Sequence, residues 1–209
     1  LQRLYAGSEG EIETPIGRYR ADVLRDGVVY EIQTGSFGAL RRKVETLADR
    51  YPVVVVYPVA QQRLIVKLDP ATGAELSSRR SPQRGRTLDL FQDFLPLREV
   101  FQLEVALTRE RVLRQDDGRG SWRRKGVSLV GRELVEVMAT ERFDTPGDLL
   151  RLLPPDLPEP FGVADLHARL GGRRSVVGRM AYALRYLGVI EQVGKQGKAR
   201  LYRCVCGMA

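Results

Sequence analysis

The chain has few of the residues on which many catalytic and metal sites depend. Its 209 residues include one histidine, His167, and two cysteines, Cys204 and Cys206. A Ser-His-Asp or Cys-His mechanism would have to use His167, and a structural zinc site needs more thiol and imidazole ligands than these. The phosphate-binding pattern of glycines that ends in Gly-Lys-Ser/Thr is also absent. Carboxylates and lysines therefore remain as the side chains available for chemistry.

Long apolar runs are missing as well. No segment approaches the roughly 18 uninterrupted apolar residues that are needed to cross a bilayer, so no membrane partner is expected. The first ten residues, LQRLYAGSEG, show no basic region followed by an apolar stretch and a cleavage site, which is the pattern of a secretory signal. With so few cysteines, these features favour a cytoplasmic protein with ordinary thiols.

The charge of the chain favours a polyanionic partner. The formal net charge is +8 and the sequence pI is about 9.8, and binding of basic proteins to a phosphate backbone is driven by the release of counterions. Residues 1–60 hold eight basic and eight acidic side chains, whereas residues 161–209 hold nine basic and two acidic ones. The C-terminal part is therefore where we expect nucleic acid to bind.

The first part of the sequence predicts a mixed α/β domain over residues 1–115. Three strand-like segments between residues 11 and 34 are separated by a Pro-Ile-Gly turn and by an Asp-Gly turn, which predicts an antiparallel meander. A helix with an N-cap at Thr34 to Ser36 should follow, and then a buried strand, PVVVVYPV, and a further strand, QRLIVKLD. The expected fold is a mainly antiparallel sheet with flanking helices.

The middle of the chain is predicted to be loops and helices. Residues 71–86 are typical of an exposed basic loop, and a short helix near residues 87–95 should break at Pro96. We expect residues 116–160 to form a helical connector, with an amphipathic helix over VGRELVEVMATERF and a short helix over TPGDLLRLL. A proline-rich spacer, LPPDLPEP, then leads to the C-terminal domain.

Residues 161–209 are predicted to fold as helix, helix and β-hairpin. In the second helix Val177, Met180, Leu184 and Leu187 form an inner stripe. This order resembles a winged helix-turn-helix, a mainly α domain in which the second helix enters the major groove and the hairpin touches the backbone. The residues that this resemblance places on DNA are Arg174, Ser175, Arg179, Tyr182, Arg185, Lys195, Lys198 and Arg200. Use of the same domain for packing or for a homodimer is the competing interpretation.

The segment RADVLRDGVVYEIQTG allows a geometric prediction. If Asp26 and Gly27 form a two-residue type I′ turn, Asp22 lies directly opposite Glu31. Arg20 then lies opposite Gln33 on the same charged face, because side chains alternate along a strand. Two carboxylates so close repel each other. A divalent cation held by carboxylate oxygens would compensate, and neutralisation by Arg20 on a solvated face is the alternative.

These residues resemble the PD-(D/E)XK nuclease superfamily. Its signature is an Asp on one strand, then Glu-x-Lys on the next strand and a helix, and here Asp22 is followed by Glu31-Ile32-Gln33 with Gln in place of Lys. The stretch is particularly similar to the nuclease-like domain of the competence protein CoiA, and the resemblance covers roughly residues 9–67. It implies a restriction-endonuclease-like fold and a Mg²⁺ (or Mn²⁺) site.

The resemblance also assigns roles to individual residues. Asp22, Glu31 and the Ile32 backbone carbonyl would ligate the metal, and Gln33 would orient the attacking water. Glutamine lacks the positive charge of the motif lysine, and Lys43, on the margin of the sheet-facing helical stripe, is a candidate replacement; a lysine that merely extends into solvent at a helix edge is the alternative. The family also places an acid before the Asp, for which Glu13 is the candidate, although a solvated strand explains Glu13 equally well.

Two further basic segments could contact a phosphate backbone. One contains Arg79, Arg80, Arg84 and Arg86, and the other contains Trp122, Arg123, Arg124 and Lys125. Trp122 could stack on a base, while solvated loops are the competing interpretation.

The sequence therefore predicts a metal-dependent DNA endonuclease in which the C-terminal domain positions duplex or branched DNA. A catalytically inactive nuclease fold that binds DNA as a regulator or adaptor is the second hypothesis. A C-terminal domain that serves as a protein-interaction module in a larger assembly is the third.

Overall fold

The structure is a computed structural model that describes residues 1–35, 37–38, 40–94 and 102–205. The chain divides into two compact units. The site unit comprises Leu1–Tyr57, Leu88–Val105 and Glu141–Ala209, and the ribbon unit comprises Pro58–Thr87 and Ala106–Thr140. Because three long strands contribute to both units, this division differs from the boundaries at residues 115 and 160 that the sequence suggests.

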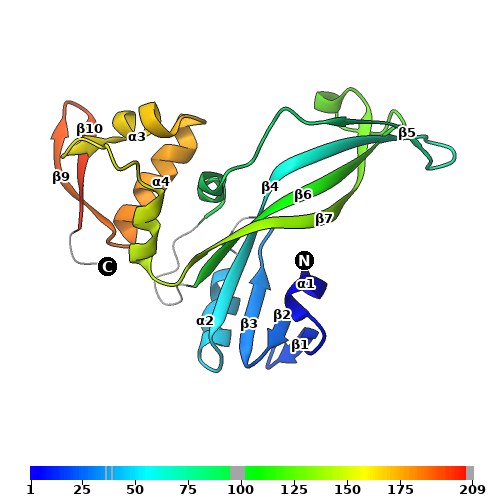
Figure 1. Ribbon diagram of the computed structural model, residues 1–209, viewed down its shortest axis with the longest axis horizontal. Helices are drawn as coiled ribbons and strands as arrows, with labels where there is room; N and C mark the ends of the chain where they lie inside the picture. The colour runs from blue at the N-terminus through cyan, green and yellow to red at the C-terminus, as the bar shows by residue number, and fades with distance from the viewer. Residues whose placement is uncertain (36, 39, 95–101, 206–209) are drawn as a thin grey trace. The chain divides into compact units, whose positions relative to one another are not determined.

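The elements follow one another in the order that Figure 1 labels. The helices of the described residues are α1 (Gln2–Ala6), α2 (Leu40–Ala48), α3 (Val163–Leu170) and α4 (Arg174–Tyr186), with short 3₁₀ helices η1 (Thr87–Gln92), η2 (Trp122–Arg124) and η3 (Pro146–Leu152). The strands are β1 (Glu11–Ile16), β2 (Tyr19–Arg25), β3 (Val28–Ile32), β4 (Val53–Leu68), β5 (Glu75–Arg80), β6 (Leu103–Asp116), β7 (Val127–Phe143), β8 (Phe161–Gly162), β9 (Ile190–Gln196) and β10 (Ala199–Cys204). Within the described residues, β1-β2-β3-β4-β6-β7 are neighbours in one sheet, in which β5 pairs with β4. The prediction of a mixed α/β fold with a mainly antiparallel sheet is confirmed.

The antiparallel meander at the N-terminus is confirmed, and so is the register between β2 and β3. The predicted Pro-Ile-Gly turn is wrong, because Pro15 and Ile16 of β1 pair with β2 and the turn lies at Gly17 and Arg18. Asp26 and Gly27 have φ angles of 52° and 73°, as a type I′ turn requires at both central positions. The turn pairs Arg25 with Val28, and the ladder continues to Val23 opposite Tyr30. β3 then pairs with β4 in parallel, and the connection between them contains α2.

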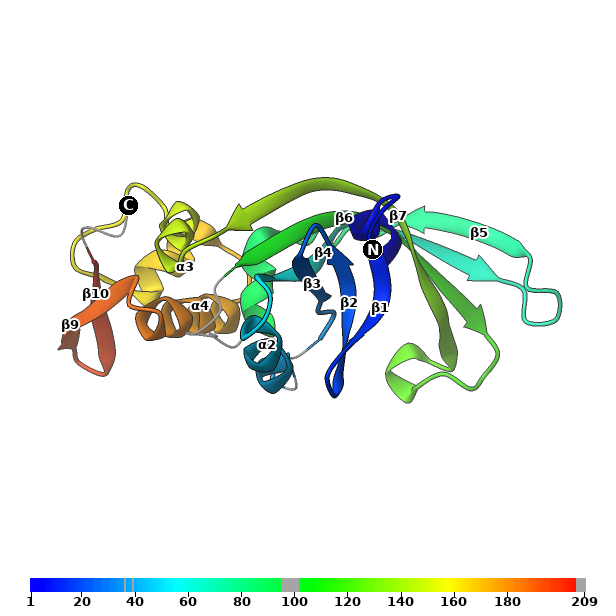
Figure 2. The same cartoon turned by 90° about the horizontal axis from the view of Figure 1, so that it is seen from below.

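Helices cover both faces of this part of the sheet. Tyr5 of α1 lies against Tyr30, with ring centroids 5.5 Å apart, while Lys43 of α2 contacts the neighbouring residue Glu31. Because adjacent residues of a strand point to opposite faces, α1 and α2 lie on opposite sides of β3 (Figure 2). α2 buries Leu40, Val44 and Leu47, as the predicted helical stripe requires. The predicted N-cap includes Ser36, which lies outside the described residues.

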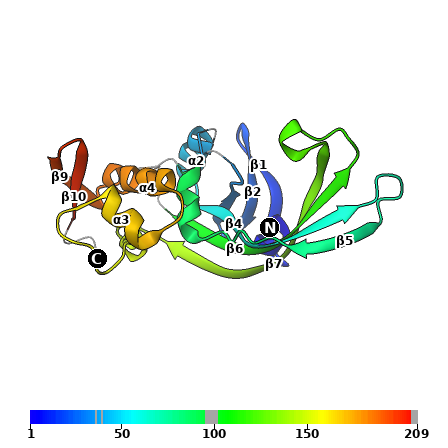
Figure 3. The same ribbon diagram turned by 90° about the horizontal axis from the view of Figure 1, so that it is seen from above.

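The buried strand PVVVVYPV is confirmed by Val53 to Val56, of which none is more than 3% exposed. It does not end before QRLIVKLD, because the two segments form the single strand β4. Residues 75–80, predicted as part of a loop, form β5, since their backbone pairs antiparallel with β4 (Figure 3). They are exposed, as expected.

The amphipathic helix predicted over residues 130–143 is wrong. These residues belong to β7, the neighbour of β6 in the sheet. Pairing with β6 supplies the backbone hydrogen bonds that a helix would have made internally, so tertiary context overrides the helical preference of residues such as Glu and Met. The predicted short helices around residues 87–95 and 145–153 occur as η1 and η3. The predicted break at Pro96 lies outside the described residues.

The C-terminal elements follow the predicted order of helix, helix and hairpin. α3 and α4 precede β9 and β10, and the short strand β8 completes a three-stranded sheet in the order β8-β10-β9. The inner stripe of α4 is confirmed, because Val177, Met180 and Leu184 are fully buried and Leu187 is 8% exposed. No helix of the described residues is both long and apolar enough to span a bilayer.

Candidate active site

The carboxylates of Asp22 and Glu31 each accept a backbone hydrogen bond across β2 and β3. The backbone N–H of Asp22 donates to Oε1 of Glu31 at 3.2 Å. The backbone N–H of Ile32 donates to Oδ2 of Asp22 at 2.7 Å. Each carboxylate therefore accepts a hydrogen bond from the backbone of the opposite strand, and the hairpin register brings the two acids together as the sequence predicts.

Lys43 of α2 completes this group. Its Nζ lies 2.5 Å from Oε2 of Glu31 and 3.8 Å from Oδ1 of Asp22. Helix α2 buries Val44 and Leu47, and the ammonium of Lys43, the residue before Val44, reaches both acids. The lysine therefore lies beside the carboxylates, as the candidate replacement for the motif lysine must. We call Asp22, Glu31 and Lys43 the carboxylate–lysine cluster.

Burial makes Glu31 electrostatically unusual. Its side chain is 1% exposed, whereas those of Asp22 and Lys43 are 22% and 21% exposed. The pKa of the Glu31 carboxyl is raised to about 7, mainly because the group is buried; the hydrogen bond from Lys43 opposes this rise, and the charge of Asp22 adds to it. A carboxyl group that titrates near neutral pH next to a second acid and a lysine is typical of functional sites.

The other residues assigned by the motif lie around the cluster in different ways. Gln33 directly follows β3 and is half-buried, and its backbone N–H donates to the Val56 carbonyl at 2.8 Å. Ile32 is half-buried on the face opposite Glu31, and its N–H rather than its carbonyl is seen to contact Asp22. Glu13 is not brought to the acids, because its carboxylate accepts a hydrogen bond from Gln2 of α1 at 2.7 Å.

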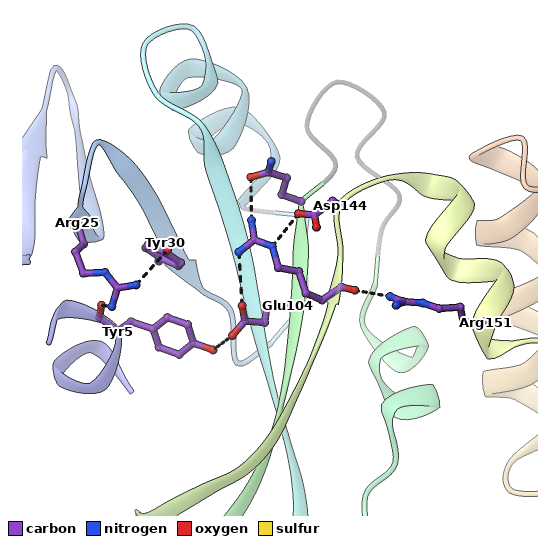
Figure 4. Close-up of polar contacts among 8 residues, drawn as sticks. Tyr5, Arg25, Tyr30, Glu104, Asp144 and Arg151 are labelled. Carbon is purple, nitrogen blue, oxygen red and sulfur yellow. Dashed lines mark hydrogen bonds and ion pairs between the residues drawn. The ribbon is translucent and has the colours of Figure 1, made fainter. Parts of the chain in front are cut away.

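The opposite face of β3 carries a polar network that the sequence does not reveal (Figure 4). Tyr5 donates a short hydrogen bond to Glu104 of β6, and Arg142 of β7 lies 3.7 Å from the other oxygen of Glu104. Arg25 donates to the Tyr5 carbonyl at 2.7 Å. These residues come from four separated segments, so no local motif could have indicated them. The network ties α1 to the sheet behind the cluster.

The donor set of the cluster suits a hard cation. Within the described residues there is no group of three or more His, Cys, Asp or Glu side chains that could hold a metal. Mg²⁺ is commonly bound by only one or two carboxylates, with waters and substrate phosphates as its other ligands. Asp22 and Glu31 meet that requirement, and the ammonium of Lys43 already places a cation against them.

The C-terminal residues predicted to bind DNA are mostly exposed. On α4, Arg174, Ser175 and Arg179 are exposed, Tyr182 is 50% exposed and Arg185 is half-buried. Arg179 donates a short hydrogen bond to the Gln92 carbonyl within the site unit, so it already has a protein partner.

The hairpin of β9 and β10 places like charges together. Lys195 and Arg200 are direct cross-strand partners, and like charges in that position are destabilising. Lys198 at the turn is exposed as well. A bound anion would relieve the repulsion between Lys195 and Arg200.

Comparison with known proteins places the chain in a family without assigning an activity. The chain belongs to the family described as a domain of unknown function, DUF8091, whose model matches residues 1–144. A relative from Treponema pallidum (strain Nichols), described as an uncharacterized protein, is 32% identical over 205 residues, which cover 94% of this chain and 79% of the relative. No solved structure matches the chain. The family match includes the carboxylate–lysine cluster and the ribbon unit but not α3, α4 or the C-terminal hairpin.

Proposed function

We propose that the protein is a metal-dependent DNA endonuclease of PD-(D/E)XK type and that Lys43 supplies the positive charge that the motif lysine supplies elsewhere. The observation that carries this proposal is the convergence of Asp22, Glu31 and Lys43, in which Lys43 Nζ lies 2.5 Å from Glu31. Asp22 and Glu31 would hold Mg²⁺ or Mn²⁺, with the Ile32 carbonyl as a further oxygen ligand. When bound, the metal would polarise the scissile phosphate and lower the pKa of the attacking water.

The chain's own residues would bind and orient the substrate. The ammonium of Lys43 attracts a phosphodiester and stabilises the negative charge that develops on it. Gln33, at the end of β3, would orient the water by hydrogen bonding, because its amide can donate and accept but carries no charge. The winged-helix arrangement proposed for α3, α4 and the hairpin would hold the duplex through Lys195, Lys198 and Arg200.

A second candidate function is a DNA-binding regulator or adaptor with an inactive site. The same ion pair favours it, because the ammonium of Lys43 already neutralises Glu31 and could remain there in place of a metal. The two candidates predict the same DNA binding and differ in cleavage.

The test is cleavage of plasmid, linear and branched DNA in the presence of Mg²⁺ or Mn²⁺. We expect the wild type to cut, and we expect Asp22→Ala and Glu31→Ala each to reduce the rate by at least about 100-fold, as the loss of one catalytic electrostatic partner commonly does. Arg42→Ala, an exposed neighbour on α2, is the control and should retain the rate. Duplex binding without cleavage under every metal condition would refute the endonuclease and leave the regulator.

A further inference from the structure

The ribbon unit carries a large positive charge of its own. Its segments, Pro58–Thr87 and Ala106–Thr140, contain fourteen basic and seven acidic side chains, a net charge of +7, against +8 for the whole chain. The site unit sums to +1, because the excess of seven positive charges over residues 161–209 is offset by acidic residues in its other segments. A sheet with so much uncompensated charge is a surface for a polyanion.

Five of the seven acids of the ribbon unit already form ion pairs with its basic residues. Arg111 contacts both Glu75 and Glu133, at 2.6 and 3.0 Å. Glu136, Glu110 and Asp116 pair in the same way with Arg109, Arg63 and Lys67. In the described part of the chain, no carboxylate lies within ion-pair distance of Arg79, Arg80 or Arg84. These three arginines are exposed and therefore accessible to a phosphate group.

The loop between β6 and β7 presents an aromatic ring to solvent. Trp122 is 83% exposed, the most exposed of the large hydrophobic side chains that the structure describes. The guanidinium of Arg123 lies over its ring, 5.6 Å from the centroid. Tryptophan seldom remains exposed unless it has a partner to cover it, because its ring is the largest apolar side chain.

The backbone holds this loop in place. The N–H of Gly120 donates to the Gly126 carbonyl at 2.9 Å, and the N–H of Lys125 donates to the Trp122 carbonyl at 3.1 Å. A Cβ atom at Gly120 would lie 2.0 Å from the Val127 carbonyl oxygen, so the loop requires glycine there. The backbone that carries Trp122 is therefore closed by hydrogen bonds within the loop.

We propose that the ribbon unit binds DNA that contains unpaired bases, with Trp122 stacked on a base and Arg79, Arg80 and Arg84 contacting the backbone. Basic grooves with exposed aromatic rings bind single strands in this way, whereas the bases of a blunt duplex are stacked on one another and cannot cover the ring. The inference takes DNA as the ligand from the proposed function and narrows the substrate to tailed or branched forms.

Trp122 provides the test, because it is the chain's one tryptophan. Binding of a single-stranded oligonucleotide and of a tailed duplex is measured in EDTA by the quenching of tryptophan emission, with a blunt duplex and heparin as polyanions without accessible bases. We expect strong quenching with the single-stranded oligonucleotide and the tailed duplex, and little with the blunt duplex and heparin. Equal quenching by the blunt duplex, or binding without quenching, would overturn the proposal. Tighter binding of the matching RNA would overturn the assignment to DNA.

Variants separate this proposal from the proposed function. Trp122→Ala should weaken binding of labelled tailed DNA about 10-fold, Trp122→Phe should retain most of the affinity, and neither should alter binding of the blunt duplex. A Trp122→Ala protein that binds tailed DNA as tightly as the wild type would refute stacking, while Asp22-dependent cleavage could still stand. Conversely, quenching in a protein that never cuts would leave this inference intact and remove the nuclease.

Discussion

The carboxylate–lysine cluster and the ribbon unit handle charge in opposite ways. In the cluster, Glu31 is buried and its charge is balanced within 2.5 Å by Lys43. In the ribbon unit, Arg79, Arg80 and Arg84 are exposed, and no acid of the described residues balances them. Buried, paired charges hold a fixed geometry at some cost in stability, whereas exposed, unpaired charges cost little and remain available to a partner. The difference predicts which substitutions affect folding and which affect only binding.

Removal of Lys43 should have the largest effect. Lys43→Ala leaves Glu31 buried without its cation, so we expect a loss of about 2 kcal/mol in the free energy of unfolding at pH 8. At pH 5 the loss should be smaller, because Glu31 is then protonated. Urea denaturation at the two pH values measures it, and Arg42→Ala, which should change stability by less than about 0.5 kcal/mol, is the control. Equal effects of the two substitutions would show that the ion pair contributes nothing to folding.

The titration of Glu31 should appear in the stability of the wild type. Its pKa rises from an ordinary value of 4.5 to about 7 on folding, so the folded state binds the proton more tightly than the unfolded state does. The titration of Glu31 does not affect stability below about pH 4.5. Between about pH 4.5 and pH 7 it lowers the free energy of unfolding by about 3 kcal/mol in total. Glu31→Gln should remove this decline from the pH profile of unfolding. A profile unchanged by the substitution would place the pKa of Glu31 near its ordinary value.

The arginines of β5 should show the opposite behaviour. Arg79→Ala combined with Arg80→Ala should change the free energy of unfolding by less than about 0.5 kcal/mol. The same double substitution should weaken binding of single-stranded DNA. It should also make the slope of log K for binding against log salt concentration shallower by up to about 1.4, because each lost phosphate contact removes about 0.7. Arg111→Ala, which removes a charge already paired with Glu75 and Glu133, is the matched control and should change the slope less.

Substitutions in the C-terminal hairpin should give the smallest change in stability, and they should raise the free energy of unfolding rather than lower it. Lys195→Ala with Arg200→Ala relieves a cross-strand repulsion, so stability should rise by a few tenths of a kcal/mol. Binding of a blunt duplex should weaken, and its salt slope should fall by about 1 for each phosphate contact that is lost. Arg203→Ala removes a charge that Glu191 balances at 2.6 Å and serves as the control. An unchanged slope in the double variant would argue against this surface as a DNA contact.

The sequence predicts those features that depend on neighbouring residues. The Asp26-Gly27 turn determines the register of β2 and β3, and the register determines that Asp22 meets Glu31. The sequence could not decide whether Lys43 reaches these acids or extends into solvent, because that depends on how α2 is rotated against the sheet. The packing of Leu40, Val44 and Leu47 sets this rotation.

The sequence does not predict features that depend on contacts between residues far apart in the chain. The residues of β7 predict an amphipathic helix from their local pattern, yet the strand that they pair with, β6, lies more than ten residues away in the sequence. Most of β7 remains exposed on both faces, so it lacks the alternation of apolar and polar residues that marks a half-buried strand. The contact between Tyr5 and Glu104 is likewise invisible in either local segment.

The backbone hydrogen bonds that the Asp22 and Glu31 carboxylates accept also matter for how the N-terminal hairpin folds. A shift of one residue between β2 and β3 would move Glu31 to the other face of the sheet, away from Lys43, and would separate both carboxylates from the N–H groups that they accept from. Such a misaligned hairpin would bury an acid without partners, which is far more costly than the loss of an apolar contact. The two residues that we propose as metal ligands thus also favour the correct register of β2 and β3 over a shifted one. Substitutions at either position should therefore be checked for a slipped hairpin before a loss of activity is assigned to chemistry.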